Sequence, residues 1–167
     1  MNSRILKYLA ITAFASILAA CSSVPLDKDS SRAGADDRDA TGTSGVAMDP
    51  FHPESPLAQK RSVYFEFDSY SIPSQYRDVV EMHSRYLSEH ANQNVRIEGH
   101  ADERGGSEYN LALGQRRSDA VRRMMTLLGV NSDQIEAISF GKERPKALGH
   151  TEADYAENRR ADIMYQR

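Results

Sequence analysis

The chain has 167 residues, of which 40% are hydrophobic and 27% charged, a composition typical of one globular domain and not of a fibrous or membrane-spanning protein. Its formal charge of −3 argues against a nucleic-acid-binding protein, because such proteins need a basic excess to neutralise phosphates. The single cysteine, Cys21, cannot form an internal disulfide, a thiolate zinc site or an iron–sulfur site. We therefore expect no nucleic-acid partner and no cofactor.

The N-terminus has the layout of an export signal over residues 1–20. Arg4 and Lys7 precede an apolar run of 13 residues, Tyr8–Ala20, which is too short to cross a hydrocarbon core that needs about 20 residues. The run ends in Leu-Ala-Ala before Cys21, which resembles the bacterial lipobox. That resemblance implies cleavage before Cys21 and acylation of this residue, and several acyl chains would anchor the protein stably in a membrane. The alternative is that Cys21 lies at the processing site by chance.

A flexible tether is predicted for residues 21–60, which include the cysteine. The stretch from Ser22 to Lys60 is rich in Pro, Gly, Ser, Thr and Asp and has almost no aromatic residues. It cannot bury enough apolar surface to offset the entropy lost on ordering. We expect the folded domain to occupy residues 61–167.

Period-two alternation predicts a strand over residues 63–68, with Val63, Phe65 and Phe67 on its buried face. Apolar residues at helical spacing then predict a helix over residues 73–91. A second strand is expected at residues 95–100, and it leads into a polar loop at residues 101–106.

The next helix is the longest, with Ser107 as the predicted N-cap and Gly129 at its C-terminal stop. A short capped turn follows at Asn131, then a third strand over residues 135–140. Thr151 and Asp154 predict the cap of a helix that ends near residue 158, before a last strand over residues 161–165. The order β-α-β-α-β-α-β favours an α/β or α+β sandwich with helices on one face of a small sheet.

The loop and the long helix offer a binding site. Asn110, Leu113 and Arg117 form one stripe of the helix, and helical side chains lean toward the N-terminus, so Arg117 should point toward Asp102 in the loop. A fixed carboxylate and a fixed guanidinium suit a zwitterionic amino-acid end, since Asp accepts from an ammonium and Arg grips a carboxylate. The alternative is a structural ion pair between these two side chains, and spacing alone does not decide.

Four segments resemble, in order, the lipoprotein members of the OmpA C-terminal-like family. They are YFEFDSY at 64–70, EGHADERG at 98–105, EYNLALGQRR at 108–117 and NRRA at 158–161. The resemblance covers nearly all of residues 62–165. It implies an α+β fold with a four-stranded mixed sheet packed against helices, and non-covalent binding of the diaminopimelate stem peptide of peptidoglycan.

The resemblance also implies residue roles. Asp102 corresponds to the aspartate that takes the diaminopimelate ammonium, and Arg117 to the arginine that takes its carboxylate. The other residues implied at the pocket are Phe67, Asp68, Ser69, Ala101, Leu113 and Arg104. The chain departs from the family pattern at Gly106-Ser107, often Thr-Pro, and at Ser118, usually Ala, but neither departure removes a charge from the site.

The resemblance implies a non-catalytic link between outer membrane and cell wall, with the domain in the periplasm. Ser22, next to the cysteine, fits an outer-membrane address. The implied partners are the Tol system and its periplasmic β-propeller protein TolB, with roles in envelope integrity and cell division. The competing class is a lipid-anchored wall hydrolase, since carboxylates such as Asp68 and Asp102 could flank a glycosidic bond. The five histidines form no zinc-binding motif, so we expect no metal.

Overall fold

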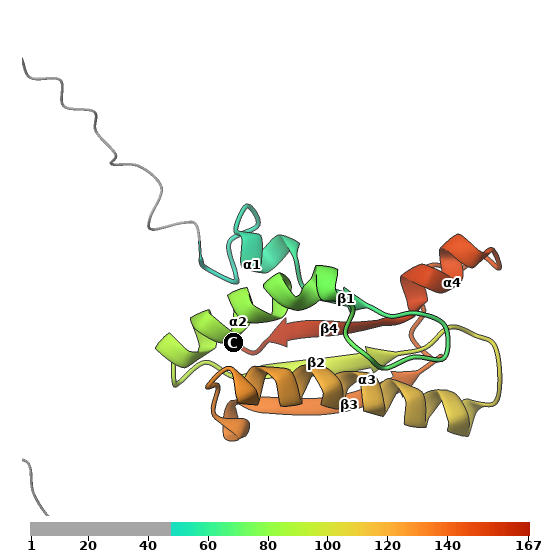
Figure 1. The fold of residues 1–167 in the computed structure, drawn as a ribbon. Coiled ribbons are helices and arrows are strands. Elements are labelled where there is room, and N and C mark those ends of the chain that lie inside the picture. Colours follow the sequence, from blue (N-terminus) through green and yellow to red (C-terminus); the bar gives the residue numbers. More distant parts are fainter. Residues whose placement is uncertain (1–47) are drawn as a thin grey trace, which may run out of the picture. The chain divides into compact units, whose positions relative to one another are not determined.

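The computed structural model describes residues 48–167, in which a four-stranded mixed sheet is packed against helices (Figure 1). The strands are β1 (Ser62–Tyr64), β2 (Val95–His100), β3 (Ile135–Gly141) and β4 (Arg160–Tyr165), and their order across the sheet is β1-β4-β2-β3. Strand β4 is antiparallel to both β1 and β2, whereas β2 and β3 are parallel. The predicted α+β class and mixed four-stranded sheet are confirmed.

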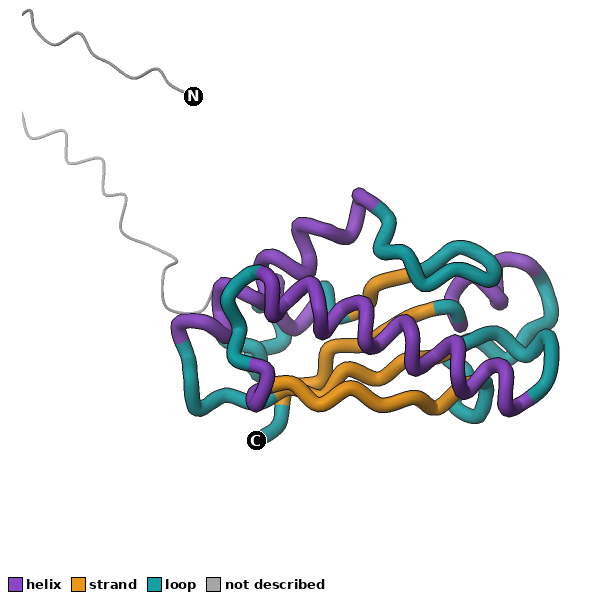
Figure 2. Tube along the Cα trace, turned by 60° about the horizontal axis from the view of Figure 1, so that its bottom comes forward, coloured by secondary structure: helices purple, strands orange, loops and turns teal. Residues whose placement is uncertain are grey.

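The helices α2 (Arg77–Glu89) and α3 (Ser107–Leu127) supply the other layer of the core. Strand residues such as Ile97 and Ile163 pack with helix residues such as Leu87 and Met125 in one buried cluster. The tube in Figure 2 shows the long helix α3 running across the sheet. Only one face of each strand faces this layer, as period-two alternation predicts.

Two glycines bring α3 very close to the sheet. A Cβ on Gly99 of β2 would lie 1.9 Å from the carbonyl oxygen of Gly114 of α3, and a Cβ on Gly114 would lie 2.3 Å from Ser139 Oγ. No larger residue fits at either position without a backbone shift. This close approach places the first turns of α3 beside the end of β2, where the predicted pocket residues lie.

Helix ends follow the sequence signals only in part. Thr151 and Asp154 form the predicted capping box of α4 (Glu152–Asn158), and Gly129 has a φ of +97° just after α3. Asn131 caps the short 3₁₀ turn η2 (Ser132–Gln134) by accepting from the Asp133 amide. The long helix α3 is confirmed but its predicted N-cap is wrong, because Gly106 occupies the N-cap position and Ser107 is the first helical residue.

The first strand is shorter than predicted. It ends at Tyr64 rather than at residue 68, and although Phe65 is buried, the Phe67 side chain is 61% exposed. The Ser69 amide donates to the Glu66 carbonyl in a turn, and Asp68 has a φ of +54°. This turn breaks the alternation and directs Phe67 away from the core.

The predicted boundary at Arg61 is also wrong, because residues 48–60 are folded. Helix α1 (Pro56–Gln59) is capped by Ser55 and buries Leu57 completely. Arg61 donates to the carbonyls of Leu57 and Pro50, and the His83 ring is 2.8 Å from the Lys60 carbonyl oxygen. These contacts offset the conformational entropy lost when residues 48–60 become ordered. That entropy cost was the reason for predicting a tether here. The predicted export signal, Cys21 and tether residues 21–47 lie outside the described residues.

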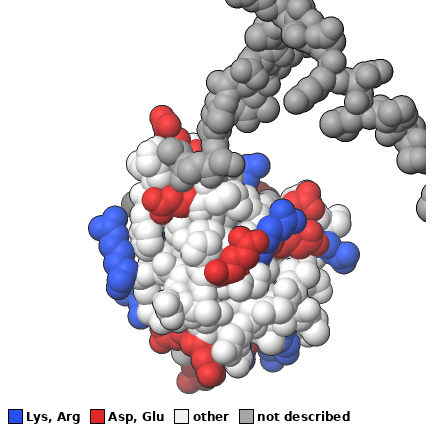
Figure 3. All heavy atoms as spheres, turned by 90° about the vertical axis from the view of Figure 1, so that its left-hand side faces the viewer, with Lys and Arg blue, Asp and Glu red and all other residues white. Residues whose placement is uncertain are grey.

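No helix within residues 48–167 is long and apolar enough to span a bilayer. Figure 3 shows the end of the domain where β4 finishes, and on this face scattered Lys and Arg lie among Asp and Glu on a mostly uncharged surface.

Candidate functional site

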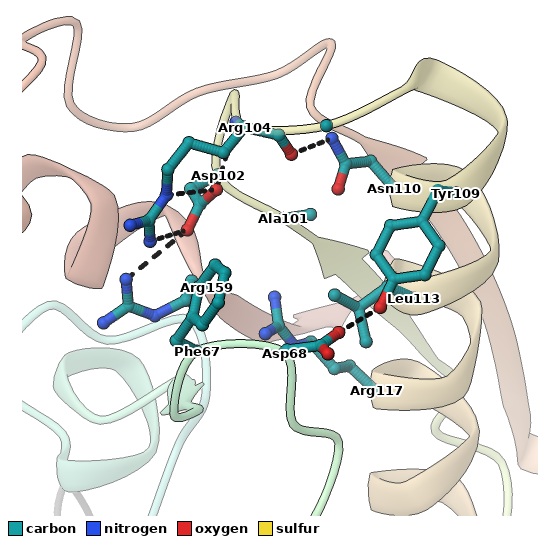
Figure 4. A pocket seen from close by; sticks show the side chains of 11 residues that line it. Phe67, Asp68, Ala101, Asp102, Arg104, Tyr109, Asn110, Leu113, Arg117 and Arg159 are labelled. Carbon is teal, nitrogen blue, oxygen red and sulfur yellow. Dashed lines mark hydrogen bonds and ion pairs between the residues drawn. The ribbon is translucent and has the colours of Figure 1, made fainter.

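A cavity of about 240 Å³ lies where β1 and β2 finish and α3 begins (Figure 4). Seven of the eight residues predicted at the pocket line it: Phe67, Asp68, Ala101, Asp102, Arg104, Leu113 and Arg117. Ser69 does not line it, but its carbonyl accepts a hydrogen bond from Arg117. The structure therefore brings the sequence-predicted residues together around one cavity.

Arg117 forms the deep wall of the pocket. It lies on α3 with no solvent exposure and donates to three backbone carbonyls, from Nε to Ser69 at 2.8 Å, from Nη1 to His100 at 2.7 Å and from Nη2 to Glu66 at 3.2 Å. Burial and the nearby charge of Arg159 lower the pKa of Arg117 to about 10, so the group stays charged at neutral pH. A guanidinium has five N–H groups, and these bonds leave one on Nη1 and one on Nη2 for a ligand.

Asp102 lies on the opposite wall and is almost fully buried. Its Oδ1 accepts from the backbone N–H and Nε of Arg104, and its Oδ2 accepts from Arg104 Nη2 at 2.6 Å and Arg159 Nη1 at 3.4 Å. Burial alone would raise the pKa of Asp102, but the hydrogen bonds and charge of Arg104, together with the hydrogen bond from Arg159, outweigh burial and lower it. Asp102 is therefore a carboxylate at neutral pH.

The alternative interpretation, a structural ion pair between Asp102 and Arg117, is only partly right. No ion pair joins Asp102 to Arg117 among the described residues, since the cations on this carboxylate are Arg104 and Arg159. Arg117 is committed to backbone carbonyls instead. The two charged groups thus face the cavity from separate walls, as binding a zwitterion requires.

The remaining charge and the rim come from the loop after β1 and from α3. Tyr109 donates a hydrogen bond from Oη to Asp68, which holds that carboxylate against the helix. Asp68 adopts a positive φ, which aspartate tolerates better than most residues. The Phe67 ring lies 4.3 Å from the guanidinium carbon of Arg104. Three guanidinium groups and two carboxylates therefore surround the cavity.

Sequence reasoning missed four residues that line the pocket: Gly105, Tyr109, Asn110 and Arg159. Asn110 could have been included, because it belongs to the helical stripe with Leu113 and Arg117; its amide donates to the Arg104 carbonyl at 2.9 Å and fixes the loop to the helix. Arg159 follows α4 and reaches the cavity because β4 lies beside β1, a pairing that local patterns do not reveal. Tyr109 and Gly105 carry no periodic signal.

No cluster of three or more metal-binding side chains occurs in residues 48–167. Glu103, the carboxylate that follows Asp102 in the loop, is hydrogen-bonded to His150 and Tyr155 and does not line the cavity. Asp68 and Asp102 do line it, but a glycosidase needs one carboxyl with a raised pKa as general acid. The pKa of Asp102 is lowered instead, which does not suit that role.

A sequence model of the OmpA family matches residues 64–159. The chain therefore belongs to the OmpA family. It is 37% identical to the peptidoglycan-associated lipoprotein of Haemophilus influenzae over 98% of this chain and 99% of that protein. It is 35% identical to the protein of the same name from Pasteurella multocida, over 97% of this chain and 99% of the relative.

Solved structures agree on the fold. The crystal structure of the peptidoglycan-associated lipoprotein from Burkholderia pseudomallei is 58% identical, with a TM-score of 0.68 over 70% of this chain and 98% of that one. The C-terminal domain of Helicobacter pylori MotB has a TM-score of 0.59 over 64% of this chain and 84% of that one, at 19% identity. At that identity the second likeness concerns the fold alone.

Proposed function

We propose that this chain is a lipid-anchored outer-membrane protein that binds the diaminopimelate stem peptide of peptidoglycan without covalent attachment. The family and the relatives named peptidoglycan-associated lipoprotein support a peptidoglycan-binding protein of the cell envelope. The chain is a binding protein and not an enzyme. Its role is to link the membrane to the wall.

The pocket is the observation that carries the proposal. The free end of diaminopimelate bears an ammonium and a carboxylate on one carbon. Arg117 presents one unused N–H on each of its two terminal nitrogens, and these suit the carboxylate. Asp102 and Asp68 supply the negative charge for the ammonium. Because these contacts are charge-assisted, even a small pocket can bind a zwitterion selectively.

The position of the pocket in the sheet also supports a link. Strands β1 and β2 run in the same direction because each is antiparallel to β4. The chain enters β1 near the end of β4, where Phe51 and Tyr165 are in edge contact, with ring centroids 6.3 Å apart. The pocket lies at the other end of β4, next to Arg159. An anchor attached through residue 48 therefore pulls on the end of the sheet opposite to the ligand.

Peptidoglycan binding is tested by comparing two soluble stem tripeptides, one with diaminopimelate and one with lysine at the third position. The lysine peptide lacks the carboxylate that Arg117 is proposed to hold. We expect the diaminopimelate peptide to bind about tenfold or more tightly, because a hydrogen bond to a charged group contributes about 1.5–3 kcal/mol. Equal binding of the two peptides would place the recognition elsewhere, and release of soluble fragments from purified wall would indicate a hydrolase.

The Tol system, and TolB in particular, is the proposed protein partner, with roles in envelope integrity and cell division. Large side chains near the pocket are exposed, with Phe67, Tyr109 and Leu111 each 50% exposed or more. Exposed aromatic residues beside a charged cavity are typical of a protein interface. A partner on this surface would compete with the wall for the same residues.

The lipid anchor is tested with Cys21→Ser. We expect the variant to lose lipid labelling and to leave the detergent phase on phase partitioning, because no second cysteine could accept the acyl group. The wall-binding domain should be unaffected, so the purified variant should sediment with peptidoglycan as the parent does. Normal detergent partitioning by the variant would contradict the lipoprotein assignment.

A further inference from the structure

The Asp102 carboxylate has no free acceptor position in this structure. A carboxylate offers about four lone-pair sites. Its Oδ1 accepts two hydrogen bonds from Arg104, and its Oδ2 accepts one from Arg104 and one from Arg159. A ligand ammonium can reach Asp102 only if one of these donors moves away.

Arg104 is the donor placed to move. Its side chain is 37% exposed, whereas the Arg159 side chain is 7% exposed and also donates from Nε to the Phe65 carbonyl. Figure 4 shows the Arg104 guanidinium beside the Asp102 carboxylate at the edge of the pocket. Arg104 thus covers the buried carboxylate with a positive charge of its own.

A second anion is already in contact with Arg104. Its Nη1 donates to Glu152 Oε2 at 3.2 Å, and the Glu152 side chain is 65% exposed. The other oxygen of Glu152 pairs with Arg159 Nη1 at 2.8 Å, so this carboxylate lies between the two arginines that hold Asp102. The guanidinium carbon of Arg104 lies 4.3 Å from the Phe67 ring centroid and 4.5 Å from that of Tyr155. Two aromatic faces allow a guanidinium to slide while it keeps its cation–π contacts. Arg104 can therefore leave Asp102 without losing every partner.

We propose that Arg104 is a resident cation that occupies the place of the ligand ammonium, and that binding is an exchange of cations on Asp102. This inference rests on the proposed binding of diaminopimelate. The ammonium takes over oxygens of Asp102 while the Arg104 guanidinium shifts toward Glu152 and the carboxylates of the ligand. No proton is transferred, because both cations stay charged and Asp102 stays ionised.

The exchange explains how a buried carboxylate is kept ready for a cation. Without Arg104 the empty pocket would hold a buried anion with Arg159 as its one cationic donor, and a buried charge with few partners is costly. With Arg104 present, the ammonium replaces an existing ion pair rather than adding one. The exchange lowers the net gain in affinity from the Asp102 contact, so the ligand remains easy to release. Without the carboxylate, the ligand ammonium would instead meet the positive charges of Arg104 and Arg159.

The test compares the affinity of Arg104→Gln, Arg104→Lys and Glu152→Gln for the soluble diaminopimelate tripeptide in the full chain. We expect Arg104→Gln to bind about threefold to tenfold more tightly than the parent, because no resident charge remains to be displaced. Arg104→Lys should restore parental affinity. Glu152→Gln should bind more weakly, since it removes the anion that receives Arg104 and that also draws Arg159 away from Asp102. Arg96→Gln is the matched control, because Arg96 is a partly exposed arginine that pairs with Glu136 and does not line the cavity.

The Nε–H resonance of Arg104 gives a second readout, and it should move on titration with the tripeptide in proportion to occupancy. Equal or weaker binding by Arg104→Gln, with the parent binding normally, overturns the exchange and leaves the proposed function intact. An Arg104 resonance that does not move overturns it as well. If the parent itself does not bind the tripeptide, the proposed function fails and the exchange fails with it.

Discussion

Asp102→Asn is expected to weaken binding of the diaminopimelate tripeptide by about 30-fold or more, since removing one member of a buried charged contact typically costs 2–5 kcal/mol. Asparagine keeps the shape and one acceptor oxygen but removes the negative charge. The variant should fold, because its oxygen can still accept from the backbone N–H of Arg104. Isothermal titration with the tripeptide and sedimentation with purified wall measure the loss.

Glu103→Gln is the matched control for this prediction. Glu103 is the next residue in the same loop, but its carboxylate is bound by His150 and Tyr155 and does not line the cavity. The affinity of Glu103→Gln for the tripeptide should stay within about twofold of that of the parent. If Asp102→Asn has a native circular dichroism spectrum and parental affinity, the ammonium does not bind at Asp102.

The lowered pKa of Asp102 determines how the stability of the fold and the ligand affinity depend on pH. The folded-state pKa lies below that of an unfolded aspartate, about 3.9, so Asp102 stabilises the fold fully above that pH. This contribution is lost as the pH falls through the lower folded value. Ligand affinity that depends on the carboxylate should therefore stay level from neutral pH to about pH 5.

Local patterns predicted most of the fold because most elements carry a clear period. Strand β2 buries Val95 and Ile97 on one face, and its predicted end at residue 100 agrees with the structure. Helix α2 follows the 3₁₀ turn η1 (Ser74–Tyr76) within the helix predicted for residues 73–91. In such segments the repeat of apolar residues and the buried face are the same property.

The errors arise where tertiary contacts decide. Leu57 is one buried apolar residue in a polar stretch and gives no periodic signal, so helix α1 was predicted as part of a tether. Phe67 continues the apolar alternation in the sequence, but β1 has already ended at Tyr64 and the backbone turns at Asp68, which has a positive φ. In the site, Arg159 reaches Asp102 across 57 residues of sequence. Spacing along a helix placed Arg117 well, but it could not show that Asp102 pairs with its own loop.

Arg117→Ala is expected to destabilise the domain by about 3 kcal/mol or more, in addition to removing the proposed carboxylate contact. The guanidinium donates to the carbonyls of Ser69, His100 and Glu66, and a buried acceptor left without its donor costs about 1–3 kcal/mol. The loop after β1 and the end of β2 are both held by these bonds. A fall in melting temperature of more than about 10 °C should follow.

Arg116→Ala is the matched control, because Arg116 precedes Arg117 on α3 and is exposed. Its guanidinium carbon lies 5.8 Å from the centroid of the Tyr70 ring, a weak cation–π contact. Its stability should change by less than about 1 kcal/mol.

Arg117→Lys separates the two roles of Arg117, since an ammonium keeps the charge but cannot reach three divergent carbonyls as a planar guanidinium does. We expect this variant to fold with intermediate stability in urea denaturation and to bind the tripeptide about tenfold or more weakly at a temperature where it is folded. Parental stability in Arg117→Ala would mean that the three carbonyls find other donors, and parental affinity in folded Arg117→Lys would remove the planar guanidinium from the recognition of the carboxylate.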